Sequence, residues 1–381
     1  MTKHVRFFDT TMRDGEQTPG VHITADQKVE IAQALEAFGV ATVEAGFPAS
    51  SPGDFAAVER VAETVRRCEV AALARCVPGD IEAVARALEH AVHPVIHVFL
   101  GVSDVHLTRK LGITRSDAIR TIETCVQQAR QYCERVQFSA EDATRTDRIF
   151  LRQCIETAIT AGASRVNIPD TVGYAMPHEY GDLIAEVVRF VEGRAIVSAH
   201  CHDDMGMATA NSVAAVEAGA RQVEVTVNGI GERAGNASAE QVAVVLALKA
   251  VAESGVDLSR ITAISRRVAE VTGVPIQPNT PIVGANAFAH ASGIHQDGII
   301  KDPENYEFVP PTLVGAPGHK FVFTARSGRR AIAHRAAAMG RPLDARTVDA
   351  VYRDFLQVAE QRRGEVPDEE IAAMIQRAAC V

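Results

Sequence analysis

Short runs of apolar, often β-branched residues alternate up to about residue 230 with longer stretches in which Ala, Leu and Glu recur at helical spacing. Runs of the first kind are typical of buried strands, and the second pattern is typical of helices with one apolar face. The sequence predicts strands over residues 5–9, 42–47, 70–76, 95–102, 136–141, 165–171, 196–202 and 222–228. It predicts helices between them over residues 25–38, 54–67, 81–90, 115–134, 149–161, 178–192 and 207–218.

The regular order of strand and helix predicts an α/β fold in which helices flank a parallel sheet. Eight such units favour a closed TIM (β/α)₈ barrel over an open, doubly wound sheet. The open alternative would carry a GxGxxG loop directly after its first strand. In this chain Gly229, Gly231 and Gly235 follow the last strand, at a different spacing. We therefore expect the barrel.

The pattern changes after Gly273. Prolines and glycines interrupt the chain repeatedly as far as Pro317, and helical spacing then resumes over 326–339 and 344–362. We predict three parts: a catalytic barrel over residues 1–273, a linker and lid subdomain over 274–325, and a helical C-terminal subdomain over 326–381.

Composition and charge narrow the class of protein. The 381 residues are 47% hydrophobic and 23% charged, which is ordinary for a globular protein and argues against disorder. The net charge of −9 disfavours nucleic acid and anionic membranes as partners, so a small molecule is the expected partner. No export signal precedes the first strand, and the longest apolar stretch, 242–252, is interrupted by Lys249 and too short to cross a bilayer.

The cysteines carry no pattern of a disulfide frame or a zinc ribbon. There are seven, an odd number, scattered without CxxC pairs at positions 68, 76, 125, 133, 154, 201 and 380. Such a set is typical of reduced thiols, so we expect a cytoplasmic protein.

Polar residues gather where the predicted strands end, and in a TIM barrel these ends carry the active site. His200 and His202 stand at i and i+2 on strand seven, so their side chains point the same way and can share one cation. Asp14 follows strand one, which closure brings beside strands seven and eight, and Asn236 in the glycine-rich loop can add a neutral oxygen. Without a metal, the histidines would be a hydrogen-bonded pair and Asp14 a helix cap. Mixed nitrogen and oxygen ligands suit Mg, Mn, Zn or Fe.

Arg13 and Glu141 are candidates for chemistry rather than ligation. Arg13 beside a metal can bind a carboxylate or polarise a carbonyl, or it can close the barrel with a salt bridge. Glu141 ends strand five and can act as an acid or base, or as a structural partner of Arg13 or Arg145. The residue types leave both interpretations of each side chain open.

Several longer strings, in order along nearly the whole chain, carry a resemblance to a known family. They are FDTTMRDGEQ at 8–17, EAGFPASSPGDF at 44–55, SAEDATRTD at 139–147, NIPDTVGY at 167–174, HCH at 200–202 and NGIGERAGNAS at 228–238. In these strings the chain resembles the metal-dependent acyl-CoA condensing enzymes and lyases related to isopropylmalate, homocitrate and citramalate synthases.

The resemblance implies a divalent metal, Mg, Mn or Zn, that chelates the carboxylate and keto oxygen of a small 2-oxo acid. It implies that Arg13 polarises the ketone, that Thr171 binds the carboxylate, and that Gln17 lies near the thioester of acetyl-CoA, the co-substrate. The implied metal ligands are Asp14, His200, His202 and Asn236. The implied acid pocket adds His97, Ser139 and Pro169, and the implied acetyl-CoA loop residues are Gly231, Glu232 and Gly235.

The implied reaction is a Claisen-type condensation, followed by hydrolysis of the CoA thioester. A proton leaves the thioester methyl, and the resulting enolate attacks the ketone. By resemblance, Glu141 works with His295 and Tyr306, and the lid string FAHASGIHQDG at 288–298 is part of the site. In related enzymes this segment covers the partner's barrel, which implies a homodimer with shared active sites.

Within the family, the strings at 50–55, 103–106, 168–171 and 277–279 are most similar to isopropylmalate synthases. This similarity implies 2-oxoisovalerate as the acid and a place in leucine biosynthesis. Gln137 stands where homocitrate synthases carry an arginine for the distal carboxylate of 2-oxoglutarate. Homocitrate synthase and pyruvate-using citramalate synthase are the alternatives.

Two departures qualify this similarity. Asp203 stands where isopropylmalate synthases commonly have asparagine, and the chain ends without the leucine-sensing domain of full-length members. We therefore expect leucine not to inhibit through that regulatory site, and steady-state assays with added leucine test this expectation.

Two other classes of function make different demands on the sequence. A lyase that cleaves a hydroxyacyl-CoA in the same barrel would need a reactive-cysteine loop, which the sequence does not show. A catalytically silent paralogue would have lost metal ligands, whereas all four are present.

Overall fold

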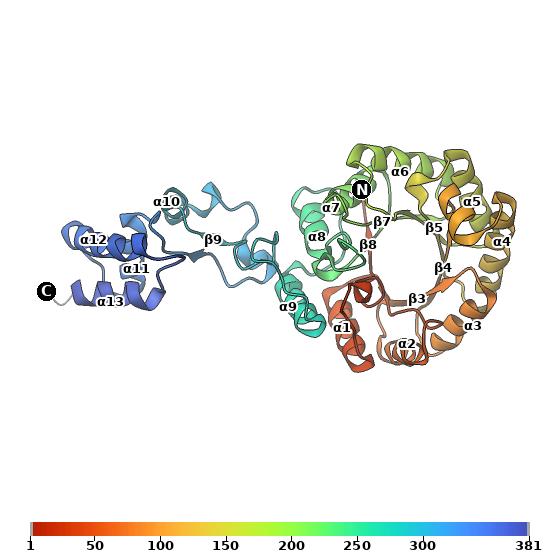
Figure 1. Ribbon diagram of the computed structural model, residues 1–381, viewed down its shortest axis with the longest axis horizontal. Helices are drawn as coiled ribbons and strands as arrows, with labels where there is room; N and C mark the ends of the chain where they lie inside the picture. Colours follow the sequence, from red (N-terminus) through yellow and green to blue (C-terminus); the bar gives the residue numbers. More distant parts are fainter. Residues whose placement is uncertain (1–2, 379–381) are drawn as a thin grey trace. The chain divides into compact units, whose positions relative to one another are not determined.

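The computed structural model describes residues 3–378 and divides into two compact units. The first unit, Met1–Ile276, is the predicted barrel. Eight parallel strands pair in chain order, β8 closes onto β1, and the helices lie outside the ring (Figure 1). The TIM barrel is confirmed. The strands are β1 (Arg6–Asp9), β2 (Thr42–Glu44), β3 (Glu69–Arg75), β4 (Pro94–Gly101), β5 (Val136–Glu141), β6 (Arg165–Asp170), β7 (Ile196–Cys201) and β8 (Gln222–Val225). The helices are α1 (Ala25–Phe38), α2 (Pro52–Thr64), α3 (Pro78–Ala87), α4 (Arg115–Tyr132), α5 (Arg148–Ala161), α6 (Pro177–Val191), α7 (Ala208–Ala218), α8 (Ala239–Leu248) and α9 (Ile261–Thr272).

The helix ends follow from local chemistry. Helix α1 begins after Thr24, whose hydroxyl accepts from the Gln27 N–H while the Gln27 side chain accepts from the Thr24 N–H. It ends at Gly39, whose φ of 96° is the left-handed conformation that glycine adopts without strain. Helix α2 starts two residues before the predicted position because Ser51 caps it and Pro52 fits its first turn.

Two strands, β2 and β8, are shorter by three residues than the sequence predicts. Strand β8 stops at Val225 because the chain enters a tight turn in which Asn228 takes a φ of 62°. Strand β2 stops at Glu44, and the Phe47 N–H donates to the Asp54 side chain at the start of α2 instead of to a strand. The buried pattern continues past both strand ends, so periodicity alone overestimates their length.

The barrel interior contains a polar layer. Gln222 Nε2 donates to Gln137 Oε1 at 2.7 Å, and Gln137 Nε2 donates to Glu224 Oε1 at 2.7 Å. These bonds join β5 and β8, which are not neighbours in the ring. They hold the buried Glu224 carboxylate in place beside β7, where the candidate site lies.

The second compact unit, Gln277–Val381, contains helices and one small sheet. Its two short strands, β9 (Ala289–His290) and β10 (Lys320–Phe321), pair in parallel. The predicted helical C-terminal part is present, and a further helix, α10, lies within the segment expected to be loop-rich. The helices are α10 (Gly293–Lys301), α11 (Arg329–Ala338), α12 (Ala345–Gln361) and α13 (Asp368–Ala378). The last three bury a common core that includes Ile332, Phe355, Ile371 and Ile375.

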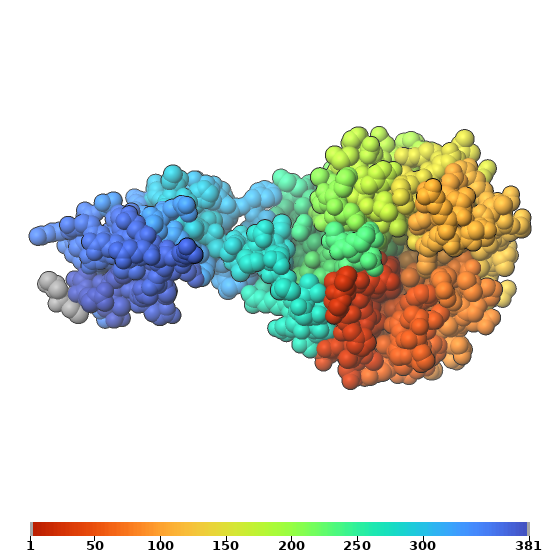
Figure 2. All heavy atoms as spheres, in the orientation of Figure 1, coloured from red at the N-terminus to blue at the C-terminus, as the bar shows by residue number. Residues whose placement is uncertain are grey.

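The helices of the barrel unit lie outside its strands (Figure 1), and Figure 2 shows the surface of the same view with all heavy atoms as spheres. Within residues 3–378, no helix combines the length and the apolar character needed to cross a bilayer. The six cysteines in this range are buried free thiols, and Cys380 lies outside the described residues.

Candidate functional site

A cavity of about 240 Å³ opens at the carboxyl ends of the barrel strands. It collects residues that lie far apart in the sequence, from the loop after β1 to the loop after β8. The lining residues are Arg13, Asp14, Gln17, Leu73, His97, Phe99, Ser139, Glu141, Asn167, Pro169, Thr171, His200, His202, Glu224, Glu232 and Arg233. Every candidate from the strand ends of β1, β4, β5, β6 and β7 is therefore at one cavity.

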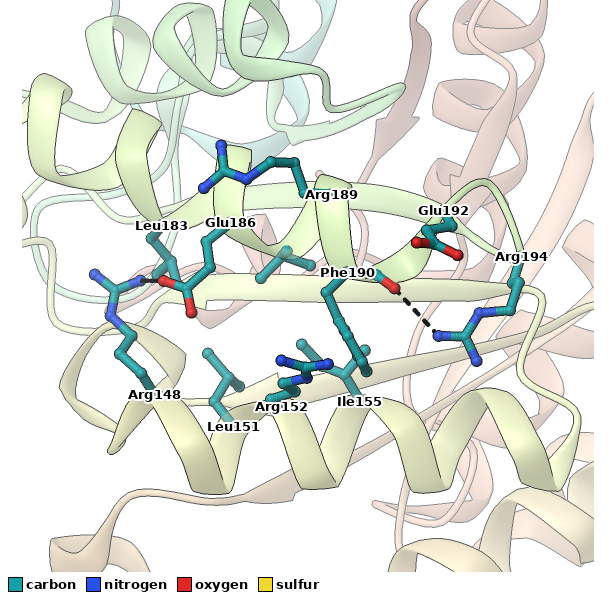
Figure 3. A pocket seen from close by; sticks show the side chains of 11 residues that line it. Arg148, Leu151, Arg152, Ile155, Leu183, Glu186, Arg189, Phe190, Glu192 and Arg194 are labelled. Atoms are coloured by element: carbon teal, nitrogen blue, oxygen red, sulfur yellow. Dashed lines mark hydrogen bonds and ion pairs between the residues drawn. The ribbon is translucent and has the colours of Figure 1, made fainter.

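A second hollow, between α5 and α6 on the outside of the barrel, measures about 440 Å³ (Figure 3). It is lined by four arginines and two glutamates among apolar side chains, and none of the predicted site residues lies there. Two of its cations pair with carboxylates of the same surface, Arg148 with Glu186 and Arg194 with Glu156. The barrel mouth is the better candidate because its groups are buried and converge.

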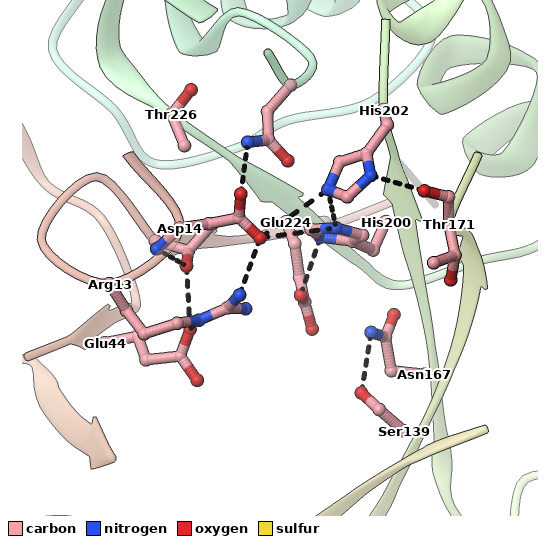
Figure 4. A network of polar contacts seen from close by, with 12 residues as sticks. Arg13, Asp14, Glu44, Ser139, Asn167, Thr171, His200, His202, Glu224 and Thr226 are labelled. Carbon is pink, nitrogen blue, oxygen red and sulfur yellow. Dashed lines mark hydrogen bonds and ion pairs between the residues drawn. The ribbon is translucent and has the colours of Figure 1, made fainter. Parts of the chain in front are cut away.

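Three ligand atoms meet in the cavity, as Figure 4 shows. His200 Nε2 and His202 Nε2 are 3.2 Å apart, and Asp14 Oδ2 lies 3.8 Å from the first and 3.6 Å from the second. Two imidazole nitrogens that each bind one ion at about 2.1 Å lie roughly 3–3.4 Å apart. The three side chains are buried, so the group has the spacing of a metal site.

The far nitrogens of both imidazoles face groups that orient the rings. His202 Nδ1 donates to the Thr171 carbonyl at 2.6 Å, and His200 Nδ1 lies 3.0 Å from Glu224 Oε2. Burial by itself lowers the pKa of His200, but Glu224 and Asp14 outweigh it and raise this pKa overall. Carboxylates and carbonyls behind ligating histidines are the usual supports of a metal centre.

Asn236 meets the requirement for a fourth ligand. Its Nδ2 donates to Asp14 Oδ1 at 2.9 Å and to the Ile230 carbonyl at 3.1 Å. Its Oδ1 is buried and has no hydrogen-bond partner among the described residues. Buried amide oxygens are nearly always satisfied, so an orphaned one beside two histidines and a carboxylate fits an oxygen ligand of a divalent metal.

Gly231 protects this arrangement. A Cβ added there would lie 2.1 Å from Asn236 Nδ2 and 3.0 Å from Asp14 Oδ1. We expect Gly231→Ala to displace the Asn236 amide and to weaken metal binding by about 10–100-fold, the usual effect of disturbing a ligand's support. Competition with a chelating dye measures the affinity. Gly79→Ala, where a Cβ meets open space, is the control; equal affinity in both variants would contradict the role given to Gly231.

Arg13 is held as a buried cation beside the triad. Its Nε donates to Glu44 Oε2 at 2.6 Å and its Nη1 to Asp14 Oδ2 at 2.6 Å. Burial alone raises the pKa of Asp14, but Arg13 and the two histidines hold it well below its ordinary value. Burial also raises the pKa of Glu44, but Arg13 and His97 outweigh it and lower this pKa to about 2. The predicted salt bridge exists, and the same geometry places a fixed positive charge at the cavity.

A chain of hydrogen bonds crosses the cavity wall from β2 to β6. His97 Nδ1 lies 2.6 Å from Glu44 Oε1, so the carboxylate fixes the proton on this nitrogen. His97 Nε2 then accepts from Ser139 Oγ at 2.7 Å, and this oxygen accepts from Asn167 Nδ2 at 2.9 Å. Thr171 Oγ1 accepts from the Asp142 N–H at 2.9 Å and keeps its own proton for another acceptor.

Several residues of the cavity were not predicted. Asn167 and Glu224 line it, and Glu44 lies behind its wall against Arg13 and His97. All three are polar residues inside otherwise apolar strands, a signal that was present in the sequence. Leu73 and Phe99 form an apolar part of the wall, and as ordinary strand residues they carry no such signal.

Glu141 has a partner that differs from both predicted ones. Lys110 Nζ donates to its two carboxylate oxygens at 2.7 and 2.8 Å. Arg13 forms ion pairs with Glu44 and Asp14 instead, and Arg145 donates two hydrogen bonds to the Asp142 carboxylate. The interpretation of Glu141 as a partner of Arg13 or Arg145 is wrong, because those cations have nearer carboxylates. Its interpretation as an acid or base stays a prediction.

The glycine-rich loop after β8 folds back on itself. Gly235 has a φ of 96°, and a Cβ there would lie 2.0 Å from the Gly229 carbonyl. Thr18 Oγ1 donates to the Gly231 carbonyl at 3.2 Å, which ties this loop to the loop after β1. Glu232 reaches the cavity, so the loop contributes one wall of the site.

His295 and Tyr306 lie in the second unit. Their rings stack with centroids 4.1 Å apart and an angle of 18° between planes. Gly298 makes this possible, since a Cβ there would lie 2.4 Å from the Tyr306 ring. The two side chains form a pair, and their part in the barrel's chemistry stays a prediction.

Comparisons with known proteins agree with this site. The family model HMGL-like matches residues 4–268, and the model described as homocitrate synthase post-HMGL domain-like matches residues 282–363. Hydroxymethylglutaryl-CoA lyase from Pseudomonas aeruginosa has a TM-score of 0.63 at 23% identity, over 72% of this chain and 95% of its own. The HMG-CoA lyase of Bacillus subtilis has a TM-score of 0.62 at 22% identity, over 72% of this chain and 95% of its own. At these identities the structures show the shared barrel fold.

Relatives in sequence are more informative. The 2-isopropylmalate synthase of Listeria welshimeri is 46% identical over 378 residues, 98% of this chain and 74% of the relative. The enzyme of the same name from Staphylococcus epidermidis is 46% identical over 380 residues, 98% of this chain and 74% of the relative. The 2-isopropylmalate synthase of Dictyoglomus turgidum is 45% identical over 372 residues, 97% of this chain and 74% of the relative. With such identity along almost its whole length, and with the ligand triad in place, the chain belongs to the 2-isopropylmalate synthase family of HMGL-like proteins.

Proposed function

We propose that the protein condenses acetyl-CoA with 2-oxoisovalerate and hydrolyses the CoA thioester, which makes 2-isopropylmalate for leucine biosynthesis. As a member of its family the chain is an acyltransferase. The observation that carries the proposal is the buried triad of Asp14, His200 and His202 with Arg13 beside it, in a cavity that has one apolar wall. We place the reaction in the cytoplasm, which the free thiols of the described cysteines support.

Binding and activation of the 2-oxo acid follow from the residues of the cavity. A divalent cation held by Asp14, His200, His202 and Asn236 would supply Lewis-acid polarisation of the ketone. Arg13 places a permanent positive charge where negative charge develops on the keto oxygen. Thr171 has a hydroxyl proton free to donate to the substrate carboxylate, and Pro169 lines the same part of the pocket.

The choice of acid rests on the charges of the described residues that line the pocket. Its two arginines are already paired, Arg13 with Asp14 and Glu44, and Arg233 with Asp204. Gln137 uses both ends of its amide inside the barrel, toward Gln222 and Glu224, so it offers no charge to a second carboxylate. Leu73 and Phe99 provide apolar surface for a branched side chain. An apolar 2-oxo acid loses less hydration here than a dicarboxylate.

The acetyl-CoA side of the reaction involves the loops and the second unit. Gln17 and Glu232 line the cavity, and we assign them with Gly231 and Gly235 to the thioester end of acetyl-CoA. Glu141 also lines it and is the proposed base, working with His295 and Tyr306. In this proposal the protein is a homodimer, and the lid at 288–298 acts on the partner's barrel. Size-exclusion chromatography with light scattering tests whether the protein is a dimer.

The function is tested by thiol release from acetyl-CoA in the presence of added Mg²⁺, Mn²⁺ or Zn²⁺. We expect release with 2-oxoisovalerate to exceed that with pyruvate and 2-oxoglutarate by at least about 10-fold in kcat/KM, the discrimination that a few buried methyl groups provide. Preference for 2-oxoglutarate would make the protein a homocitrate synthase, and preference for pyruvate a citramalate synthase. Absence of release with all three acids would overturn the assignment as a condensing enzyme.

A further inference from the structure

Lys110 contacts the proposed base from a turn whose shape is unusual. The turn, η2 (His106–Leu111), is π-helical and ends at Gly112, whose φ is 66°. Single π-helical turns are rare and are often found at functional sites. Lys110 Nζ reaches both oxygens of Glu141, at 2.7 and 2.8 Å. A cation that contacts both oxygens restricts the direction of the carboxylate more than a cation that contacts only one oxygen does.

The turn is anchored, so the direction of Lys110 is set by the fold. Leu107 is buried, and its carbonyl accepts from the Ile113 N–H at 3.0 Å. Thr108 Oγ1 donates to the Asp104 carbonyl at 2.6 Å, and the Asp104 carboxylate forms a two-pronged pair with Arg115. Bonds on both sides of the turn therefore hold it against β4 and α4.

The strand beside Glu141 leaves space for this arrangement. Gly101 on β4 pairs in register with Glu141 on β5. A Cβ at Gly101 would lie 2.9 Å from Glu141 Oε2 and 2.7 Å from His106 Nδ1. The glutamate side chain thus lies across the glycine, where any larger residue would collide with it.

The other charged and titratable groups around Glu141 do not replace Lys110. His106 Nδ1 is 3.4 Å from Glu141 Oε2 and is buried with no hydrogen bond among the described residues. Its Nε2 is 3.7 Å from Asp142, which Arg145 neutralises. Without Lys110, the carboxylate would be free to rotate toward His106 and away from the cavity.

We propose that Lys110 is a positioning residue of the condensation, which holds the Glu141 carboxylate in its catalytic direction from the π-helical turn. The inference rests on the proposed function, because it takes Glu141 as the base. It adds a residue outside the metal centre and outside the substrate pocket, since Lys110 does not line the cavity. Misplacing a catalytic group by about 1 Å can slow a reaction roughly 100-fold.

The first test compares Lys110→Met with Lys110→Arg. We expect Lys110→Met to lower kcat about 10–100-fold while KM for both substrates changes by less than about twofold, because binding surfaces are intact. Lys110→Arg keeps the charge and the reach, and we expect it to restore most of kcat. Arg109→Met, which removes the neighbouring exposed cation of the same turn, is the control and should behave as wild type. A rise in KM for acetyl-CoA at constant kcat would make Lys110 a binding residue and overturn the proposal.

The second test is a double-mutant cycle with Glu141→Gln. If Lys110 acts through Glu141, then Lys110→Met has little further effect on kcat in the Glu141→Gln background. An equal effect of Lys110→Met in both backgrounds would sink the inference. Turnover by the wild-type protein with 2-oxoisovalerate is measured first, so that failure of the proposed function is recognised separately from failure of the role of Lys110.

Discussion

A His200→Ala variant is expected to lose its bound divalent metal and to turn over acetyl-CoA roughly 100- to 1000-fold more slowly, while its fold persists. The triad then offers two ligand atoms instead of three, and the site loses the imidazole that Glu224 orients. Lewis-acid polarisation contributes several kcal/mol to the transition state, and each 1.4 kcal/mol is about tenfold in rate.

Metal content after dialysis, initial rates and circular dichroism together measure this effect. His178→Ala, at an exposed position near the start of α6, removes a histidine of the same barrel and should keep both metal and activity. Full activity of His200→Ala at wild-type metal content would remove His200 from the metal centre.

The largest effect on stability is expected from Arg13→Met. This change leaves the buried carboxylates of Glu44 and Asp14 without their cation, and unpairing a buried ion pair costs about 3–5 kcal/mol in the free energy of unfolding. Arg60→Met, which breaks an exposed pair with Asp26 on the barrel's surface, should cost no more than about 1 kcal/mol. Urea titrations of both variants, as metal-free proteins, provide the comparison. A cost for Arg13→Met no larger than that of Arg60→Met would contradict the role of the buried pair.

The pH dependence of stability has a defined sign. In the wild-type protein the pKa of Glu44 is about 2, below its ordinary value of 4.5. Its contribution to stability is therefore present above about pH 4.5 and is lost as the pH falls toward 2. In Arg13→Met the burial of Glu44 loses its main opposing charge, so we expect acidification from pH 7 to 5 to stabilise the variant more than the wild type. The wild type also gains over this interval, because burial raises the pKa of Asp9 to about 7. Arg13→Lys keeps a charge without the guanidinium fork and should recover part of the stability but little activity.

Much of the candidate site could be predicted because a barrel puts strand ends at one face. His200 and His202 were expected to face the same way from their i, i+2 spacing, and their Nε2 atoms do meet. Asp14 and Asn236 are 222 positions apart, yet the closure of β8 onto β1 brings them into hydrogen-bond contact. The resemblance carried by the strings of the sequence is confirmed by the family to which the chain belongs.

The partners of the charged residues were not predictable in the same way. Glu141 had two open interpretations, as an acid or base and as a partner of Arg13 or Arg145, and its ion pair is with Lys110. The carboxylates that hold Arg13 and His200, Glu44 and Glu224, also escaped prediction. Spacing along the chain indicates which face a side chain occupies, but not which of several cations on that face is nearest.

The sequence by itself determined the barrel, the approximate positions of α1 to α7, and the residue types that gather at its mouth, because these depend on local periodicity and on which strand each residue ends. Only the tertiary structure decided that Arg13 is shared between Glu44 and Asp14, that Asn236 keeps a buried oxygen without a partner, and that a π-helical turn directs Lys110 onto Glu141. Those outcomes depend on distances of a few tenths of an ångström between elements far apart in the chain, and the closure of the ring sets such distances.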